Sequence, residues 1–402
     1  MLTAVKIEKF LSCKDVTLSE LGPVVALVGR NGAGKTNILK AIEWAANAAT
    51  STEDLSALIS FVAESGTLIS VTLEFKIDNQ FFRYSVRIPI TPKGMVNGTD
   101  GDEYAVLNVS FSESLSKRRN ESAEWIPLIA RQDEIVDIRS DAKQVPIGKL
   151  SPCLPAIMKL LPTSQAAKFI PIVLPFLSAI RYYPLEEASE LPQKTIISPV
   201  EYAQWLIQFD NGNEPLDSLS NRILHMHLER KEELERVKRL LGSSGIGLIE
   251  DIEVKELTVT APNTQPTKLY QILFKLGDVP NSSLYLWQLS LGTRRVLRIL
   301  TTMIFDKSSV FLFEQPEDAI HAGLLRKLID IIRTEADPSQ FILASHSNIV
   351  KDSLHPEDVR LVEMKDGATH VRPLTPLEIS VAKEFVGNVG PLSDYLESVV
   401  EE

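Results

Sequence analysis

The chain has 402 residues, a length that predicts two or three compact units, or one large domain with a long insertion. Apolar residues make up 44% and charged residues 24%, a globular composition that argues against a disordered or fibrous protein. The formal net charge of -11 argues against a general nucleic-acid coat, so any nucleic-acid contact is expected to be local.

The chain carries no signal of secretion or of membrane insertion. Its start, MLTAVKIEKF, lacks an apolar leader, and no run of about 18 uninterrupted apolar residues occurs. We therefore expect a cytoplasmic protein without a membrane partner. The two cysteines, Cys13 and Cys153, are too few for a disulfide framework and are expected to be small buried hydrophobes.

The first third of the chain alternates between strand and helix signals. A strand at 5–10 and a second at 24–28 precede a Gly-rich loop, and a helix is predicted over 37–49. Alternating apolar residues between Thr67 and Phe111 predict antiparallel strands. The Pro-punctuated stretch from Ser114 to Phe176 predicts short helices in an inserted lobe.

The second half begins with a helical pattern from Pro199 to Leu241, whose apolar seam is too short for a long coiled coil. Strands are predicted next, at 246–261 and 268–277, followed by an apolar helix that starts near Leu291. The remainder alternates strand and helix, which predicts a βαβ series with a parallel sheet; its segments are VFLF, GLLRKLIDIIRTE, FILAS and VRLVEM.

The strongest motif is GRNGAGKT, residues 29–36, which matches the P-loop pattern between an apolar strand and a helix. In a P-loop, glycines let backbone N–H groups surround phosphates, and the helix N-terminus adds positive potential. Lys35 would reach the β- and γ-phosphates, and the Thr36 hydroxyl would ligate Mg²⁺. The predicted nucleotide-binding residues of this loop are Asn31, Gly32, Ala33, Gly34, Lys35, Thr36 and Asn37.

A P-loop protein also needs an acid at the end of a neighbouring strand to hold magnesium. Glu314 follows four apolar residues, where a buried parallel strand would emerge. The alternative is a solvated strand-end acid, which the P-loop in the same chain makes the weaker interpretation. ATP and Mg²⁺ are therefore the expected cofactors, with Thr36 and Glu314 as metal ligands.

These residues carry a family resemblance. VFLFEQPEDAIH resembles the Walker B motif and D-loop of ABC-type ATPases, LSLGTRR their signature motif, and FILASHS their switch-histidine segment. The opening sequence through the P-loop is similar to the RecF, SMC and OLD-like branch, and the AAA-like ATPases of bacterial defence operons match best. The resemblance implies an α/β fold: an ABC-type P-loop ATPase head with an antiparallel β subdomain and a large mixed or helical insertion.

In such proteins two heads close on two ATP molecules, and the resemblance implies a role for each matching residue. Ser290 and Gly292 of one head would contact the γ-phosphate held by the other, and His346 would sense that phosphate. Arg294 and Arg295 would add positive charge beside the signature. The alternatives are an ordinary N-capping serine and a structural histidine.

The residues after Glu314 depart from the family pattern. Gln315 stands where the family has its catalytic Glu, and Gln cannot accept a proton at neutral pH, although its amide can orient water. Slow hydrolysis is the expectation. Glu317 is a candidate substitute base or a D-loop acid that faces the partner head, and His321 replaces the usual D-loop Asp.

The Walker A and Walker B halves must meet in one sheet, so the ATPase head is predicted to be discontinuous, over 1–112 and 245–375. A mainly helical lobe is expected at 113–244 and a helical extension at 376–402.

The leading hypothesis is a nucleotide-driven homodimer, or a higher even oligomer, that regulates a separate effector, a nuclease or toxin in anti-phage defence. Two alternatives are a RecF-like DNA-binding ATPase in repair and a stand-alone ATPase whose lobe binds a small ligand. Basic clusters at Lys117–Arg119 and at Arg294, Arg295 and Arg298 are either local DNA contacts or ordinary surface and ion-pair groups.

Overall fold

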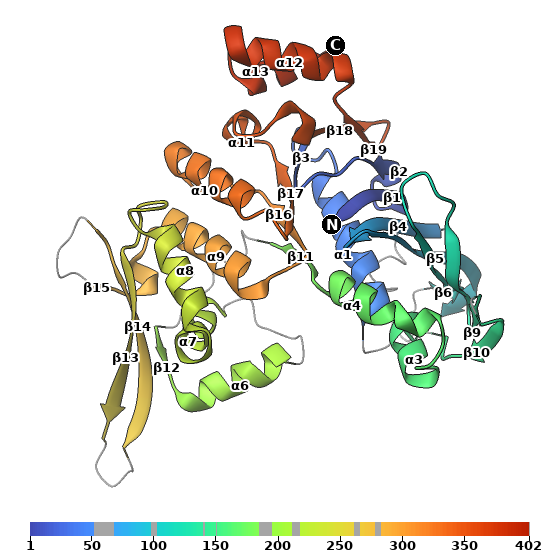
Figure 1. Cartoon of the computed structure of the whole chain (residues 1–402), viewed down its shortest axis with the longest axis horizontal. Helices are drawn as coiled ribbons and strands as arrows, with labels where there is room; N and C mark the ends of the chain where they lie inside the picture. The colour runs from blue at the N-terminus through green and yellow to red at the C-terminus, as the bar shows by residue number, and fades with distance from the viewer. Residues whose placement is uncertain are drawn as a thin grey trace. The chain divides into compact units, whose positions relative to one another are not determined.

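The computed structural model describes residues 1–51, 68–97, 103–139, 141–149, 151–184, 195–210, 218–260, 266–277 and 283–401 (Figure 1). The chain forms two compact units, and each is built from more than one stretch of sequence. The first unit comprises Met1–Tyr183, Ser308–Glu314 and Ala336–Glu402, and the second comprises Pro184–Lys307 and Gln315–Glu335. Among the described residues, no helix combines the length and apolarity that a membrane span requires.

The first unit contains a six-stranded sheet in the order β11-β16-β17-β3-β18-β19. Its strands are β3 (Val24–Val28), β11 (Ile180–Tyr183), β16 (Val310–Glu314), β17 (Gln340–Ser345), β18 (Val359–Lys365) and β19 (Ala368–Pro373). All neighbouring pairs are parallel except β18 and β19. Every residue of β3 and β17 is buried, as expected for parallel strands covered on both faces. The predicted meeting of the P-loop strand and the Glu314 strand in one sheet is confirmed, with β17 between them.

The first unit also contains several helices, of which α1 (Lys35–Thr50) and α4 (Ile170–Ser178) contact this sheet. Helix α1 follows β3 and buries an alanine-rich face, which lets it pack closely on its neighbours. Helices α3 (Cys153–Leu160) and α4 share the same hydrophobic core. Short α11 (Asn348–Asp352) follows β17. The predicted helical extension after residue 376 is present as α12 (Pro376–Asn388) and α13 (Leu392–Glu401).

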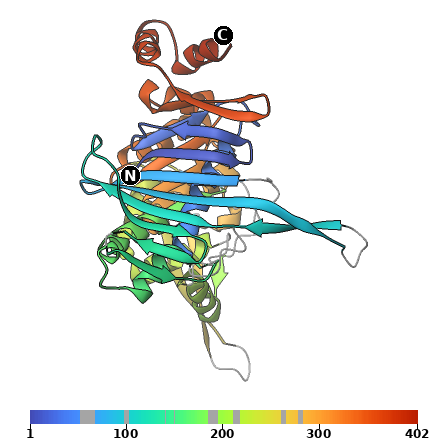
Figure 2. The same ribbon diagram turned by 90° about the vertical axis from the view of Figure 1, so that its right-hand side faces the viewer.

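A large antiparallel sheet forms the rest of the first unit, in the order β10-β9-β8-β7-β5-β4-β1-β2, with β6 paired to β5. Figure 2 shows its strands side by side. Alternate residues of β4 are buried, namely Ile69, Val71, Leu73 and Phe75. The strands are β1 (Leu2–Phe10), β2 (Cys13–Leu18), β4 (Leu68–Ile77), β5 (Gln80–Asn97), β6 (Glu103–Val109), β7 (Ser112–Arg118), β8 (Ile126–Gln132), β9 (Ile135–Ile138) and β10 (Lys143–Pro146).

The prediction of short helices from Ser114 onward is wrong for residues 114–146, which form β7 to β10; helices begin only at Cys153. The reason is that two buried positions in these strands carry charges. Glu113 is buried in β7 and Arg131 in β8, so the apolar alternation of a half-buried strand is hidden in the sequence. The residues up to Tyr183, which we expected in the helical lobe, belong to the first compact unit.

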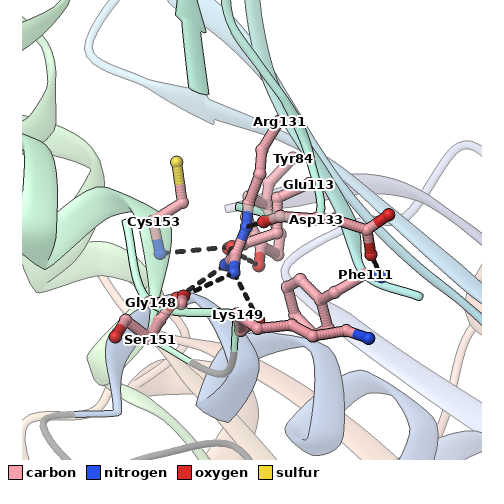
Figure 3. A network of polar contacts seen from close by, with 9 residues as sticks. All are labelled: Tyr84, Phe111, Glu113, Arg131, Asp133, Gly148, Lys149, Ser151 and Cys153. Atoms are coloured by element: carbon pink, nitrogen blue, oxygen red, sulfur yellow. Dashed lines mark hydrogen bonds and ion pairs between the residues drawn. The ribbon is translucent and has the colours of Figure 1, made fainter. Parts of the chain in front are cut away.

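Glu113 and Arg131 form an ion pair of 2.8 Å with both side chains buried (Figure 3). The Tyr84 hydroxyl donates to Glu113 Oε1 at 2.7 Å, and the Cys153 N–H donates to Glu113 Oε2 at 3.1 Å. The Arg131 guanidinium also donates to four backbone carbonyls, those of Asp133, Gly148, Lys149 and Ser151. The pair therefore fastens the loop before α3 to the antiparallel sheet.

The two cysteines are buried, as predicted. Burial raises the pKa of the Cys13 thiol to about 11 and raises that of Cys153 well above its usual range. Both thiols therefore stay protonated at neutral pH and serve as small core residues.

The second unit contains helices α6, α7 and α8, which confirm the helical pattern predicted from Pro199 to Leu241, and a small sheet in the order β12-β14-β13, with β15 also paired to β14. The predicted strands near 246–261 and 268–277 are the antiparallel pair β13 and β14. The elements are β12 (Ile196–Ile197), α6 (Pro199–Asp210), α7 (Leu219–Glu229), α8 (Lys231–Leu241), β13 (Asp251–Val259), β14 (Thr267–Lys275), β15 (Ser283–Leu284), α9 (Leu291–Asp306) and α10 (Ala322–Thr334).

An aromatic cluster joins α6, α7 and α9 within the second unit. The His225 ring lies 5.8 Å from the rings of both Trp205 and Phe305, and its Nδ1 is hydrogen-bonded to the Tyr202 hydroxyl at 2.7 Å. Burial is the main cause that lowers the pKa of His225, and the positive charge of the nearby Arg230 lowers it further. The histidine is thus a neutral member of an aromatic core.

Candidate functional site

The loop 29–36 connects β3 to α1 and is shaped by its glycines. Gly32 and Gly34 have φ angles of 77° and 97°, a region that side chains disfavour. A Cβ on Gly34 would lie 1.9 Å from Thr369 Oγ1, and a Cβ on Gly29 would lie 2.0 Å from the Val362 carbonyl oxygen. The glycines are therefore required by close approach of β18 and β19 as well as by the turn.

A chain of hydrogen bonds supports this loop. Asn37 Nδ2 donates to Ser12 Oγ at 2.7 Å, the Ser12 hydroxyl is bonded to Thr369 Oγ1 at 2.7 Å, and Thr369 Oγ1 donates to the Ala33 carbonyl at 3.0 Å. Asn37, predicted to bind nucleotide, uses its side-chain amide in this support. Ser12 and Thr369 were not predicted from the sequence, because no motif contains them.

The Lys35 side chain folds back over the loop. Its ammonium donates to the Gly29 and Arg30 carbonyls at 2.8 and 3.0 Å, and the residue is 7% exposed. The ammonium is therefore already fixed at the loop, where phosphate oxygens would be its natural partners.

Glu314 meets Thr36 at the end of β16. The Thr36 hydroxyl donates to Glu314 Oε1, and the Tyr182 hydroxyl donates to Glu314 Oε2. A hydroxyl and a carboxylate are the hard oxygen ligands that Mg²⁺ prefers, usually with substrate phosphates completing the coordination. Among the described residues, no group of three or more His, Cys, Asp or Glu side chains could hold a metal alone. The donor set at Thr36 and Glu314 thus fits a magnesium ion that arrives with a nucleotide.

Two cavities adjoin the P-loop within the first unit. One, of about 420 Å³, is lined by Gly29, Arg30 and Asn31 together with His346 and residues of α11 and α13. The other, of about 590 Å³, is lined by residues 29–33 and by residues 362–365 of β18. The structure therefore brings the predicted switch histidine to the same cavity as the P-loop.

The signature residues lie in the second unit. Ser290 is the exposed N-cap of α9, and its Oγ accepts a hydrogen bond from the Thr293 N–H at 3.1 Å. A Cβ on Gly292 would lie 2.3 Å from the Ala319 carbonyl oxygen of the same unit. Both residues therefore have a structural reason to be present, and their predicted contact with a second head stays a prediction.

The turn after β16 contains the other predicted catalytic residues. Gln315 has a φ of 45°, and its carbonyl accepts a hydrogen bond of 2.5 Å from Arg295, which also lies 3.7 Å from the Asp318 carboxylate. Glu317 is buried, and His321 caps α10 through Nδ1. Arg295 is itself buried and holds this turn, and its predicted contribution of positive charge beside the signature stays a prediction.

Several side chains of the two basic clusters contact other residues of the protein or are buried. Lys117 lies 3.8 Å from the centre of the Phe169 ring, and Arg118 pairs with Glu74 and donates to the Glu121 carbonyl. Arg298, like Arg295, is buried. The clusters therefore lend no support to the RecF-like DNA-binding alternative.

Comparison with known protein families shows which family the chain belongs to. A profile described as "AAA domain, putative AbiEii toxin, Type IV TA system" matches residues 24–352, well over half of the sequence. The chain belongs to this AAA-domain family. The matched region includes both the P-loop and Glu314, so this AAA-domain protein carries the two motifs in the order expected of an ATPase. No curated protein matches its sequence.

Solved structures show the fold of this AAA-domain protein. It is similar to an SMC head crystallised with the C-terminal winged-helix domain of ScpA, at 13% identity and a TM-score of 0.51, covering 94% of this chain and 99% of that one. The SMC heads of Thermotoga maritima (13% identity, TM-score 0.45, 93% and 99% covered) and Pyrococcus furiosus (13%, 0.49, 96% and 99%) are also similar. The predicted fold class and the ABC- and SMC-type resemblance are confirmed.

Proposed function

We propose that this protein binds ATP with Mg²⁺, hydrolyses it slowly, and uses nucleotide-driven pairing of two heads to regulate a separate effector, a nuclease or toxin in anti-phage defence. The observation that carries the proposal is the contact between Thr36 of the P-loop and Glu314 of β16. It unites the two halves of a nucleotide site that lie 278 residues apart.

Each residue of the site has a task that follows from its chemistry. Backbone N–H groups of the glycine loop and the N-terminus of α1 favour the anionic phosphates, and the Lys35 ammonium neutralises them. Thr36 and Glu314 would hold Mg²⁺, which supplies charge neutralisation at the β- and γ-phosphates. His346, from the cavity beside Asn31, would donate a hydrogen bond to the γ-phosphate.

Slow turnover follows from Gln315. Its amide orients water but does not remove a proton, so unless Glu317 acts as the base the site lacks a contribution on the order of 100-fold or more. Long occupancy by ATP suits a switch better than it suits a high-turnover enzyme.

The pairing surface is proposed from the exposed Ser290 at the N-terminus of α9, which would reach the γ-phosphate held by a second copy. The family description, "AAA domain, putative AbiEii toxin, Type IV TA system", supports the link to toxin–antitoxin systems but does not name a separate effector. The structural relative bound to ScpA supports a head that engages a separate protein.

Two variants test the proposal. Lys35→Ala should abolish ATP binding in calorimetry, because the phosphates lose their nearest cation, and unchanged affinity would remove the P-loop assignment. Ser290→Arg should retain ATP binding but remain monomeric in light scattering with a non-hydrolysable ATP analogue, whereas the wild type should double in mass. Identical masses for all samples with and without the analogue would contradict nucleotide-driven pairing.

A further inference from the structure

Tyr182 contacts Glu314, the proposed Mg²⁺ ligand, and belongs to no sequence motif. It lies in β11, the edge strand beside β16, with its backbone opposite Leu312. Alternate residues of a strand point to opposite faces, so Tyr182 reaches along the face that carries Glu314. The neighbouring Tyr183 is bonded instead to Ser308 Oγ at 3.0 Å.

The Tyr182 hydroxyl restricts a flexible carboxylate. A glutamate side chain has several rotatable bonds, so a single contact with Thr36 leaves its carboxylate free to turn. The second hydroxyl engages the other oxygen, Glu314 Oε2. The remaining oxygen, Oε1, therefore points toward the Thr36 hydroxyl, so the two proposed Mg²⁺ ligands lie next to each other.

Tyr182 is itself held by the P-loop helix. Its backbone N–H donates to Glu43 Oε1 of α1 at 3.2 Å. Tyr182 therefore links the P-loop helix, the edge strand and Glu314. Because its backbone is held by α1, its hydroxyl can hold the Glu314 carboxylate in one orientation.

We propose that Tyr182 is a positioning residue that orients Glu314 for Mg²⁺ and thereby sets the Mg²⁺ requirement of nucleotide binding. The proposal rests on the proposed function, since it assumes that Thr36 and Glu314 receive the metal. Partners that orient metal ligands typically change metal affinity by 10- to 100-fold when they are lost.

The test measures binding, not turnover. Calorimetry of the full chain with a non-hydrolysable ATP analogue, over a series of Mg²⁺ concentrations, compares wild type, Tyr182→Phe and Tyr183→Phe. Tyr182→Phe should need about 10-fold more Mg²⁺ for half-maximal enhancement of binding, with unchanged affinity in EDTA. Tyr183→Phe, the matched control one residue away, should behave as wild type.

A second measurement separates positioning from structural damage. In a Glu314→Ala background, Tyr182→Phe should have no further effect on the Mg²⁺ requirement, because there is no carboxylate left to orient. Equal Mg²⁺ curves for wild type and Tyr182→Phe, or an equal shift in the Glu314→Ala background, would overturn the Tyr182 proposal alone. Absent or Mg²⁺-independent nucleotide binding by the wild type would overturn the proposed function and this inference with it.

Discussion

Removal of the Arg131 guanidinium should strongly destabilise the first unit. The side chains of Arg131 and Glu113 are 0% and 1% exposed. Arg131→Met keeps the apolar stem and the approximate length but leaves the Glu113 carboxylate without its counter-ion. It also leaves four backbone carbonyls of the strand and loop without their donor.

The expected loss of unfolding free energy in Arg131→Met is taken from the cost of breaking a buried ion pair, not from a sum over the hydrogen bonds of Arg131. Hydrogen bonds to a charged group contribute about 1.5–3 kcal/mol each, but those of one guanidinium are not additive. Removing one partner of a buried ion pair costs about 3–5 kcal/mol. Because domains are stable by about 5–15 kcal/mol, Arg131→Met should remove about a fifth or more of the stability of the first unit.

The assay needs a probe confined to the first unit, because two units need not unfold in one transition. Trp44 is 4% exposed and lies 5.9 Å from the Phe10 ring in the core of the first unit. In a Trp205→Phe, Trp287→Phe background, the remaining tryptophans, Trp44 and Trp125, both report on that unit. Urea denaturation followed by fluorescence then gives its free energy of unfolding.

Two companion variants sharpen the test. Tyr84→Phe, which removes one hydroxyl from the network, should cost less than Arg131→Met. Arg131→Met combined with Glu113→Met should be less destabilising than the sum of the two single changes, because no buried charge remains.

The pH dependence has a defined sign. Burial already raises the pKa of Glu113 in the intact network, and loss of Arg131 should raise it further. A group with a raised pKa in the folded state contributes stability at low pH and loses it as pH rises. The cost of Arg131→Met should therefore grow between pH 5 and pH 7.5. A cost below about 1 kcal/mol at pH 7.5, or one independent of pH, would refute the reasoning.

Two further predictions concern turnover and acid stability. Gln315→Glu should accelerate single-turnover ATP hydrolysis by about 100-fold, because it supplies a positioned base; an unchanged rate, with activity lost in Glu317→Gln, would show that Glu317 is the base. Since its pKa is lowered, His225 should make the second unit less stable as pH falls below about 6.5, and urea unfolding followed by Trp205 fluorescence should show this loss reduced in His225→Phe. The exposed His370, replaced in His370→Gln, is the control, and equal acid sensitivity of the two variants would contradict the assignment.

The parts of the proposed nucleotide site that could be predicted are those in which the backbone conformation or burial allows only a few residue types. Gly34 must adopt a left-handed φ beside Thr369, and the buried strands β3 and β16 admit almost only apolar residues, so motif and strand are visible in the sequence. Lys35 and Thr36 could then be predicted at the start of α1 and Glu314 at the end of β16, because the glycine loop and the buried strands fix these positions.

What escaped prediction depends on contacts between distant residues. Tyr182 lies 132 residues from Glu314, and Thr369 lies 336 residues from Ala33, so neither partner is recognisable before the sheets form. The strands that contain Arg131 and Glu113 were not predicted, for a different reason. Charged side chains at buried strand positions contradict the polarity rule unless their partners are known.

The division of the chain gives β16 an unusual mechanical position. Ser308–Glu314 is a seven-residue piece of the first unit, joined at both ends to segments of the second. Its flanking residues, Lys307 and Gln315, have φ angles of 46° and 45°, a costly conformation for residues with side chains. Within the second unit, Lys307 pairs with Glu233 and Arg295 holds the Gln315 carbonyl. The strand that carries Glu314 is thus continuous at both ends with residues that side chains of the second unit hold in place.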